Sequence, residues 1–168
     1  NNLFLTGSSG FVVKNLIRFL ENEISINKFE KNSSIVIAEQ IVIHLAGKAH
    51  DLKKTSNLEE YYQVNTEFTK KVFDAFLASE ARVFITLSSV KAVADQVEGE
   101  LTEQYQPNPI THYGKSKLLA EEYILSMSIP EGKRVYILRP CMIHGPGNKG
   151  NLNLLYKIVS NNYPWPLG

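Results

Sequence analysis

Residues 3–13 read Leu-Phe-Leu-Thr-Gly-Ser-Ser-Gly-Phe-Val-Val, an apolar run that ends at once in a turn containing Gly7 and Gly10. A helical pattern follows, because Val12, Leu16 and Phe19 are spaced to share one face. Strand, glycine turn and helix in this order suit phosphate binding, since glycines allow close backbone approach and the helix N-terminus offers free N–H groups. An ordinary turn between a strand and a helix is the alternative for this segment taken alone.

The phosphate-binding interpretation predicts contacts of a dinucleotide with Gly7, Ser9, Gly10, Phe11 and Val12. The usual pattern has a third glycine, and Val13 stands in its place. That glycine normally lets the helix pack closely on the strand. We therefore expect the branched side chain of Val13 to push the two elements apart or to tilt the helix.

The rest of the chain alternates between strand and helix patterns. Further strands are expected at residues 41–46, 83–87 and 135–138, and further helices at about 61–76 and 113–128. Continuous apolar strands separated by helices are typical of right-handed βαβ units. We predict an α/β fold with a Rossmann-type, doubly wound parallel sheet.

The stretch from about Glu21 to Gln40 does not fit a complete fold of this type. After the first helix only a short segment remains, and parallel neighbouring strands need a dozen or more residues per crossover. Residues 35–38 could form a strand, but they run almost directly into the next one. Either the protein trims this edge of the sheet, or the sequence lacks a segment here, and we favour the second explanation.

Composition limits the classes of partner. The chain has 168 residues, and 18 lysines and arginines nearly balance 17 aspartates and glutamates. No global field therefore favours nucleic acid or a membrane surface. No apolar run is long enough to span a bilayer and no signal peptide is recognisable, so we expect a cytoplasmic protein. The single cysteine, Cys141, and histidines without metal-ligand spacing predict neither a disulfide nor a metal site.

Tyr113 and Lys117 are four residues apart on one face of a predicted helix. A neighbouring ammonium favours the phenolate and moves a tyrosine towards proton exchange near neutral pH. Ser89, at the end of the preceding strand, could bind the same substrate oxygen. Each feature alone also occurs on solvated helices and in plain turns, but all three in order, downstream of a glycine turn, predict catalysis by Ser89, Tyr113 and Lys117.

With these residues the chain resembles the extended branch of the short-chain dehydrogenase/reductase family, which contains nucleotide-sugar epimerases, dehydratases and 4-ketoreductases. The likeness rests on motifs in family order: residues 6–11, 44–47, 64–65, 87–89, the pair Tyr113 and Lys117, and residues 138–140 with 144–147. It implies a Rossmann domain at residues 1–148 and the start of a substrate-binding portion at 149–168. Most of that substrate-binding portion would lie outside this chain.

The resemblance also implies roles for particular residues. NAD is the expected cofactor, with NADP not excluded, and its further expected contacts are Leu45, Ala46, Gly47, Asn65, Ser88, Tyr113, Lys117, Pro140 and Ile143. Tyr113 would take the proton of the sugar 4-hydroxyl while hydride leaves C4, Lys117 would hold the nicotinamide ribose and lower the pKa of Tyr113, and Ser89 would steady the 4-oxygen. The expected contacts of the nucleotide-sugar substrate are Lys48, Ser89, Lys91, Tyr113 and Asn151.

Residues 145–151 and 164–168 look most like bacterial enzymes that act on UDP-N-acetylhexosamines in surface-polysaccharide synthesis, a subgroup of 4-epimerases and 4-ketoreductases. Dehydratases usually have an acidic pair after the catalytic serine or threonine, whereas Val90 and Lys91 follow Ser89 here. A reductase of another carbonyl substrate and a non-catalytic dinucleotide sensor are the alternatives. Relatives pair through the helices near residues 61–76 and 113–128, which predicts a homodimer.

The choice between NAD and NADP stays open at this point. The acid that binds the ribose hydroxyls of NAD belongs at the end of the second strand. Glu30 and Glu39 are candidates, but Lys28 and Lys31 could equally suit a 2′-phosphate.

Overall fold

The computed structural model describes residues 2–31, 33–48, 57–147 and 151–161, with no description of the side chains of 151–154. Five parallel strands form one sheet in the order β2-β1-β3-β4-β5. They are β1 (Asn2–Thr6), β2 (Ser25–Lys28), β3 (Ile41–His44), β4 (Val83–Leu87) and β5 (Arg134–Leu138). The predicted doubly wound parallel sheet is therefore confirmed.

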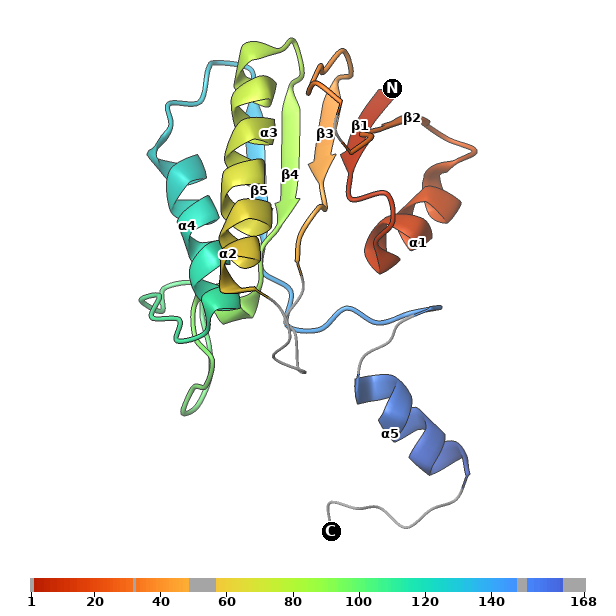
Figure 1. The fold of residues 1–168 in the computed structure, drawn as a ribbon, viewed down its shortest axis with the longest axis vertical. Helices are drawn as coiled ribbons and strands as arrows, with labels where there is room; N and C mark the ends of the chain where they lie inside the picture. Colours follow the sequence, from red (N-terminus) through yellow and green to blue (C-terminus); the bar gives the residue numbers. More distant parts are fainter. Residues whose placement is uncertain (1, 32, 49–56, 148–150, 162–168) are drawn as a thin grey trace.

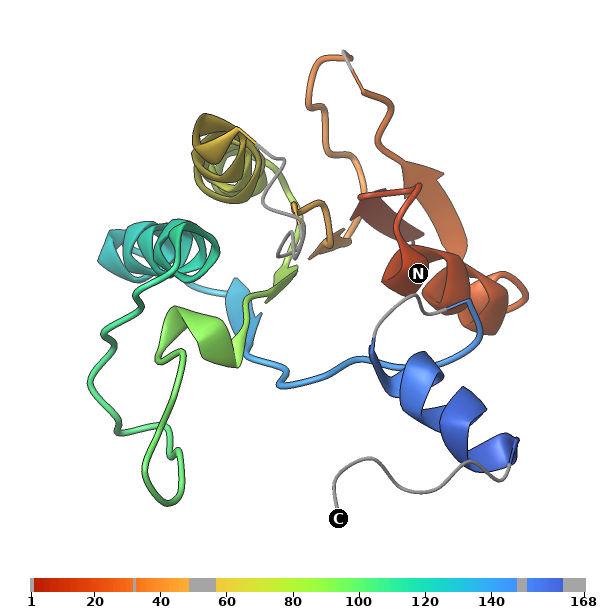
Figure 2. The same cartoon turned by 60° about the horizontal axis from the view of Figure 1, so that its bottom comes forward.

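Helices cover both faces of this sheet (Figures 1 and 2). The helix α1 (Phe11–Leu20) lies on one face. The other face carries a continuous helical stretch, α2 (Leu58–Tyr61), the π-helix η1 (Tyr62–Glu67) and α3 (Phe68–Ala78), together with α4 (His112–Ser126). A 3₁₀ turn, η2 (Val90–Ala92), follows β4, and α5 (Asn151–Ser160) lies beyond β5.

Strand β1 shows how alternation divides the core into two layers, because successive side chains point to opposite faces. Leu3 and Leu5 pack with Val13 of α1, whereas Phe4 packs with the aromatic cluster of α3 and β4 that includes Phe73 and Phe84. Val13 is only 1% exposed, so the position of the third glycine accommodates a branched side chain inside the interface between α1 and the sheet. Whether this side chain widens the interface stays a prediction.

Residues 21–40 contain the second strand of the sheet, but not where the sequence suggested it. The second strand is Ser25–Lys28, and residues 35–38 form no strand. The described residues between β2 and β3 form no helix, and Phe29, Ile35 and Ile37 pack against the aromatic cluster. Apolar side chains thus lie here without a crossover helix, and whether the sequence lacks a segment at this edge stays a prediction.

Candidate active site

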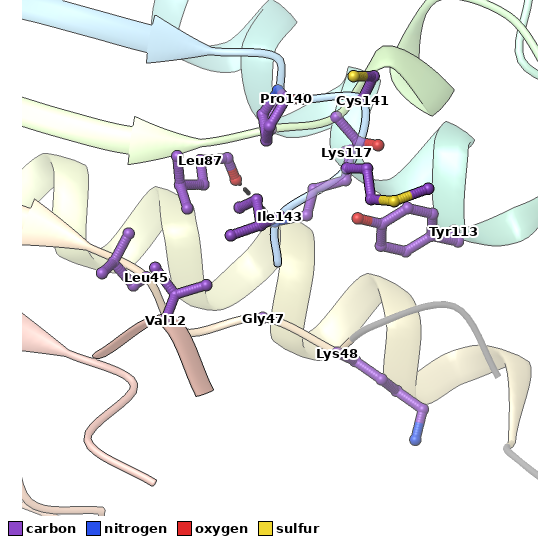
Figure 3. Close-up of a pocket in the computed structure, with 13 residues that line it drawn as sticks. Val12, Leu45, Gly47, Lys48, Leu87, Tyr113, Lys117, Pro140, Cys141 and Ile143 are labelled. Atoms are coloured by element: carbon purple, nitrogen blue, oxygen red, sulfur yellow. Dashed lines mark hydrogen bonds between the residues drawn. The ribbon is translucent and has the colours of Figure 1, made fainter. Parts of the chain in front are cut away.

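The carboxyl ends of β3, β4 and β5 meet beside the start of α4 at a hollow of about 330 Å³ (Figure 3). Its lining combines residues from segments that are far apart in the sequence. They are Val12, Leu45, Gly47, Lys48, Leu87, Ser88, Ser89, Tyr113, Lys117, Pro140, Cys141, Met142 and Ile143. In parallel sheets ligands bind at this end of the strands.

The first turn of α4 is held against η2 by close backbone packing. Thr111 caps the helix, and its side chain accepts a hydrogen bond from the amide of Gly114. A Cβ at Gly114 would lie 2.2 Å from the carbonyl oxygen of Lys91, so no side chain fits there without movement. Ser89 caps η2, and its hydroxyl accepts from the amide of Lys91 at 3.2 Å. This packing places Tyr113 next to Ser89.

Tyr113 is largely buried, and burial raises the pKa of its phenol. A hydrogen bond with Ser89 works in the opposite direction, and Tyr61, whose ring meets that of Tyr113 edge-on at 6.3 Å, raises the pKa further. The net shift of the Tyr113 pKa is therefore opposite to the one expected from Lys117 alone. Burial outweighs the stabilisation of the phenolate, and the phenol is protonated at neutral pH.

Lys117 lies deep in the site. Its ammonium donates to the carbonyl oxygen of Leu87 at 2.9 Å. Burial lowers its pKa to about 8, although the carboxylate of Glu121 opposes that shift. Glu121 is itself 2% exposed and forms a bidentate pair with Arg139, which follows β5. A charged lysine is thus held beside Tyr113 below about pH 8.

Asn65 lies in the π-helical segment η1 and joins three parts of the site. Its amide oxygen accepts from the Lys48 amide at 2.8 Å, and its NH₂ group donates to the Lys48 carbonyl and to the Ser116 hydroxyl. A neighbouring bond runs from the Thr66 hydroxyl to the Ser116 carbonyl oxygen. The π-helical turn, a feature often found at functional sites, therefore ties the segment after β3 to α4.

His44 is fully buried at the end of β3. Thr69 donates to the Asn65 carbonyl, so it accepts from His44 Nε2 at 2.9 Å. His44 Nδ1 then accepts from Thr6 at 2.8 Å, and Thr6 accepts from the Ala46 amide. Burial, with a smaller effect of Lys117, lowers the pKa of His44 to about 3, so it is neutral and structural.

A second hollow of about 560 Å³ adjoins the glycine turn. Gly7, Ser9, Gly10 and Ala46 line it, and Leu45 and Gly47 line both hollows. Gly7 has φ +83°, and a Cβ there would lie 2.7 Å from the backbone of Leu45 and Ala46. No side chain caps the N-terminus of α1, so its first N–H groups remain available. Two joined hollows beside an uncapped helix N-terminus fit an extended dinucleotide with its diphosphate at the turn.

Most of the sequence-predicted site residues line one of these hollows, but several lie elsewhere. Phe11 lines neither hollow, Asn65 acts through its hydrogen bonds, and Lys91 Nζ pairs with Asp95 at 3.3 Å. The side chain of Asn151 lies outside the described residues.

The sequence did not predict several residues that line the two hollows, because these residues belong to no recognisable motif. Met142 follows Cys141 along the first hollow, and Gln63, Phe68 and Lys71 line the second. Asp95 was also missed. Its carboxylate accepts from the amides of Ile110 and Thr111 and thereby supports the start of α4. Lys71 occupies a polar position in a recognisable helical pattern, and this position could have indicated it. No local sequence motif marks Asp95.

Within the described ranges, no cluster of histidine, cysteine, aspartate and glutamate is suited to hold a metal ion. None of the helices that the structure describes combines the length and the apolar character needed to cross a membrane.

The arrangement can be compared with known proteins at this point. Residues 3–162 match the NAD dependent epimerase/dehydratase family. The chain belongs to this family. The family match covers the glycine turn, both hollows and the residues Ser89, Tyr113 and Lys117.

Curated relatives of this epimerase/dehydratase-family chain are about twice its length. The UDP-glucose 4-epimerase of Vibrio cholerae is 29% identical over 99% of this chain and 59% of its own. The GDP-6-deoxy-D-mannose reductase of Pseudomonas aeruginosa is 31% identical over 88% of this chain and 54% of its own. The alignment with the Vibrio enzyme extends over 194 residues, more than the 168 of this chain, so it contains gaps on this chain's side.

Solved structures share the fold. MoeE5 in complex with UDP-glucuronic acid and NAD aligns with a TM-score of 0.80 at 21% identity, over 94% of this chain and 61% of that one. This likeness confirms the Rossmann-type arrangement of the epimerase/dehydratase-family chain.

Proposed function

We propose that this chain is the dinucleotide-binding and proton-transferring part of a nucleotide-sugar 4-epimerase, which acts at C4 of a UDP-hexose or UDP-N-acetylhexosamine. One observation carries the proposal: Ser89, Tyr113 and Lys117 line a single hollow, and that hollow adjoins the one at the glycine turn. The family match supports the reaction class, and the 4-epimerase of Vibrio cholerae supports the position on the sugar.

A bound nicotinamide dinucleotide would supply the hydride acceptor and donor. The turn at Gly7, Ser9 and Gly10 and the backbone at Gly47 are the groups we propose for its diphosphate. Pro140 and Ile143 would line the nicotinamide part, and Lys117 would hold the ribose beside it. Each of these residues lines one of the two hollows.

Tyr113 would exchange the proton of the sugar 4-oxygen. Because burial raises its pKa, the phenol holds its proton and suits donation to a C4 carbonyl in the reductive half of the reaction. In the oxidative half the same group must start as the phenolate and take the proton of the sugar 4-hydroxyl while hydride leaves C4, and the ammonium of Lys117 favours that phenolate. Ser89 would donate a hydrogen bond to the 4-oxygen in both halves.

The sugar and its diphosphate would lie on the open side of the first hollow. Lys48 lines that hollow and pairs with Glu60 at 2.7 Å, so its charge is already oriented. We propose Lys48, Lys91 and Asn151 as substrate contacts. Lys91 would first have to leave Asp95. The charged nucleotide sugar and dinucleotide place the proposed reaction in the cytoplasm.

A 4-ketoreductase is the second candidate. The protonated state of Tyr113 favours reduction, and the Pseudomonas reductase is 31% identical to this chain. A non-catalytic sensor is a poorer candidate, because both the tyrosine and the lysine of the catalytic pair are present and face one hollow.

The deciding experiment follows UDP-GlcNAc and UDP-GalNAc by proton NMR after addition of the purified protein, with and without NAD. Interconversion of the two sugars without net NADH would support the epimerase. Net oxidation with stoichiometric NADH would instead support the ketoreductase running in reverse. Conversion of neither sugar would leave the sensor if the dinucleotide still binds, and a degenerate enzyme if it does not.

A tyrosine pair provides the matched control. Tyr113→Phe removes the proton-transferring hydroxyl and should lower kcat by at least about 10³-fold while nucleotide binding persists. Tyr136→Phe removes a hydroxyl on β5 that lines neither hollow, and it should leave kcat unchanged. Equal activity of both variants would exclude Tyr113 as the proton carrier.

We also propose that the protein is a homodimer formed through the surface of α3 and α4. These helices lie side by side, and Leu119 and Leu125 of α4 are 43% and 72% exposed. A dimer would bury both leucines. Light scattering on the wild type and on Leu125→Glu tests this, and a monomer mass for the wild type would contradict it.

A further inference from the structure

The second hollow has an unusual charge for the site of a dinucleotide's adenosine. Lys31 lines it from the connection after β2, and Lys71 lines it from α3. Both side chains are exposed, and no described carboxylate lines this hollow or pairs with either lysine. Two cations therefore face the space where, under the proposed function, the adenosine half would bind.

Neither acid near the β2 end lines this hollow. Glu39 is 8% exposed, and its carboxylate accepts from the Asn27 side chain at 2.8 Å and from the Ala38 amide at 3.0 Å. Glu30 is also absent from the lining, and its main-chain carbonyl accepts both the amide and the hydroxyl hydrogen of Ser33. The described lining therefore offers two lysines and no carboxylate to the ribose.

The two lysines are brought to one wall by aromatic packing. The rings of Phe29 and Phe68 lie 5.4 Å apart and form an apolar surface between the two segments. Lys31 follows Phe29 by two residues, and Lys71 follows Phe68 by one helical turn. The turn at Glu30–Ser33 holds the backbone around Lys31. An adenine on this apolar surface would have both ammonium groups at its ribose.

We propose that this hollow binds the 2′-phosphate of an NADP-type dinucleotide through Lys31 and Lys71. A carboxylate accepts hydrogen bonds from a free 2′-hydroxyl and repels a 2′-phosphate, whereas ammonium groups attract the phosphate. Lys31 also lies 21 residues after Gly10. In Rossmann-type folds, the residue that distinguishes NAD from NADP lies in this region. The inference rests on the proposed dinucleotide site, and it assigns NADP, not NAD, as the cofactor that this site selects.

Calorimetric titration of the purified protein with adenosine 2′,5′-bisphosphate and with 5′-AMP tests this without requiring turnover, since the probes differ only in the 2′-phosphate. The bisphosphate should bind at least about tenfold more tightly at low salt. Lys31→Gln and Lys71→Gln should each remove much of that difference and leave AMP affinity unchanged. Lys28→Gln, which alters an exposed lysine of β2 that does not line the hollow, is the matched control and should change neither affinity.

Three outcomes would overturn the inference in different ways. Equal affinities for the two probes, or a preference for AMP, would mean that the site selects NAD while the proposed function stands. No binding of either probe would overturn both, because the adenosine site itself would then be absent. Retained preference in both Lys31→Gln and Lys71→Gln would place the phosphate elsewhere.

Discussion

The ammonium group of Lys117 donates a 2.9 Å hydrogen bond to the carbonyl oxygen of Leu87, the last residue of β4. This bond ties the turn of α4 that carries Tyr113 to the strand end that continues into Ser89. It also keeps Lys117 away from bulk water, and burial lowers its pKa to about 8. One contact thus sets both the geometry of the site and its behaviour at alkaline pH.

The buried lysine predicts a pH-dependent stability. Its pKa is lower in the folded state than in the unfolded chain, so folding carries a penalty below about pH 8, where both states bind the proton. The penalty disappears as pH rises from about 8 to about 10.5, and it is on the order of 3 kcal/mol. Urea unfolding of wild type and Lys117→Met should show the wild type gaining stability relative to the variant across this window. A constant difference between pH 7 and 10 would contradict the assignment.

Catalytic activity should decrease with rising pH, although the loss of the Lys117 proton increases stability. If the charged ammonium is required, kcat/KM falls above about pH 8 as Lys117 loses its proton. The pH profile of the wild type, measured with the nucleotide sugar that turns over, checks this. Absence of an alkaline limb between pH 7 and 9.5 would exclude a need for the charge on Lys117.

Removal of the Asn65 side chain should cost both stability and rate. Asn65→Leu leaves the amide and carbonyl of Lys48 without their partner and removes the bond to Ser116. We expect a loss of about 2–4 kcal/mol in the free energy of unfolding, together with a lower kcat. Ser116→Ala removes only one of these bonds and should cost about 1 kcal/mol. Equal effects of the two substitutions would mean that the bonds to Lys48 contribute nothing.

Asp95 should act as a positioning residue for α4. Burial alone would raise its pKa, but hydrogen bonds from the amides of Ile110 and Thr111, from Lys91 and from the Thr111 hydroxyl together lower it. Its contribution to stability is therefore present above the unfolded value near 3.8 and is lost as pH falls below it. Asp95→Ala should cost about 1–3 kcal/mol by urea unfolding at neutral pH.

The neighbouring exposed acid provides the control for Asp95. Glu98→Ala removes a carboxylate on the same loop that accepts no hydrogen bond described in the structure, and it should change stability by less than about 0.5 kcal/mol. Because Asp95 supports the helix that carries Tyr113, its removal should also lower kcat. Unchanged kcat in Asp95→Ala would show that Thr111 alone positions α4.

Lys133 closes the carboxyl end of α3. Its ammonium donates to the carbonyl oxygens of Phe76, Ser79 and Ala81 at 3.1, 2.6 and 2.6 Å, and it lies over the Phe76 ring. Lys133→Met keeps the aliphatic stem and removes these bonds, so we expect a loss of about 2 kcal/mol. Lys14→Met, on the exposed side of α1, should have little effect. Thermal unfolding of both variants checks the difference, and equal melting temperatures would contradict the role.

The sequence by itself determined the alternation of strands and helices, the glycine turn and the order of Ser89, Tyr113 and Lys117. These features depend on neighbours within one turn of helix or one strand, where spacing alone decides which side chains share a face. Tyr113 and Lys117 could be paired from the sequence for that reason. The π-helical turn at Asn65 could not, because the pattern of apolar residues there is the same as in an ordinary helix.

Only the tertiary structure decided the charge and protonation of the site. The pKa of Tyr113 depends on burial between α4, Tyr61 and η2, and this burial makes the net shift opposite to the one expected from Lys117 alone. Lys31 and Lys71 are 40 residues apart in the sequence and face one hollow only because Phe29 packs on Phe68. The packing of Phe29, Ile35 and Ile37 against the aromatic cluster beyond β2 was likewise visible only in the fold. Burial and long-range packing depend on the whole fold, so no local pattern contains them.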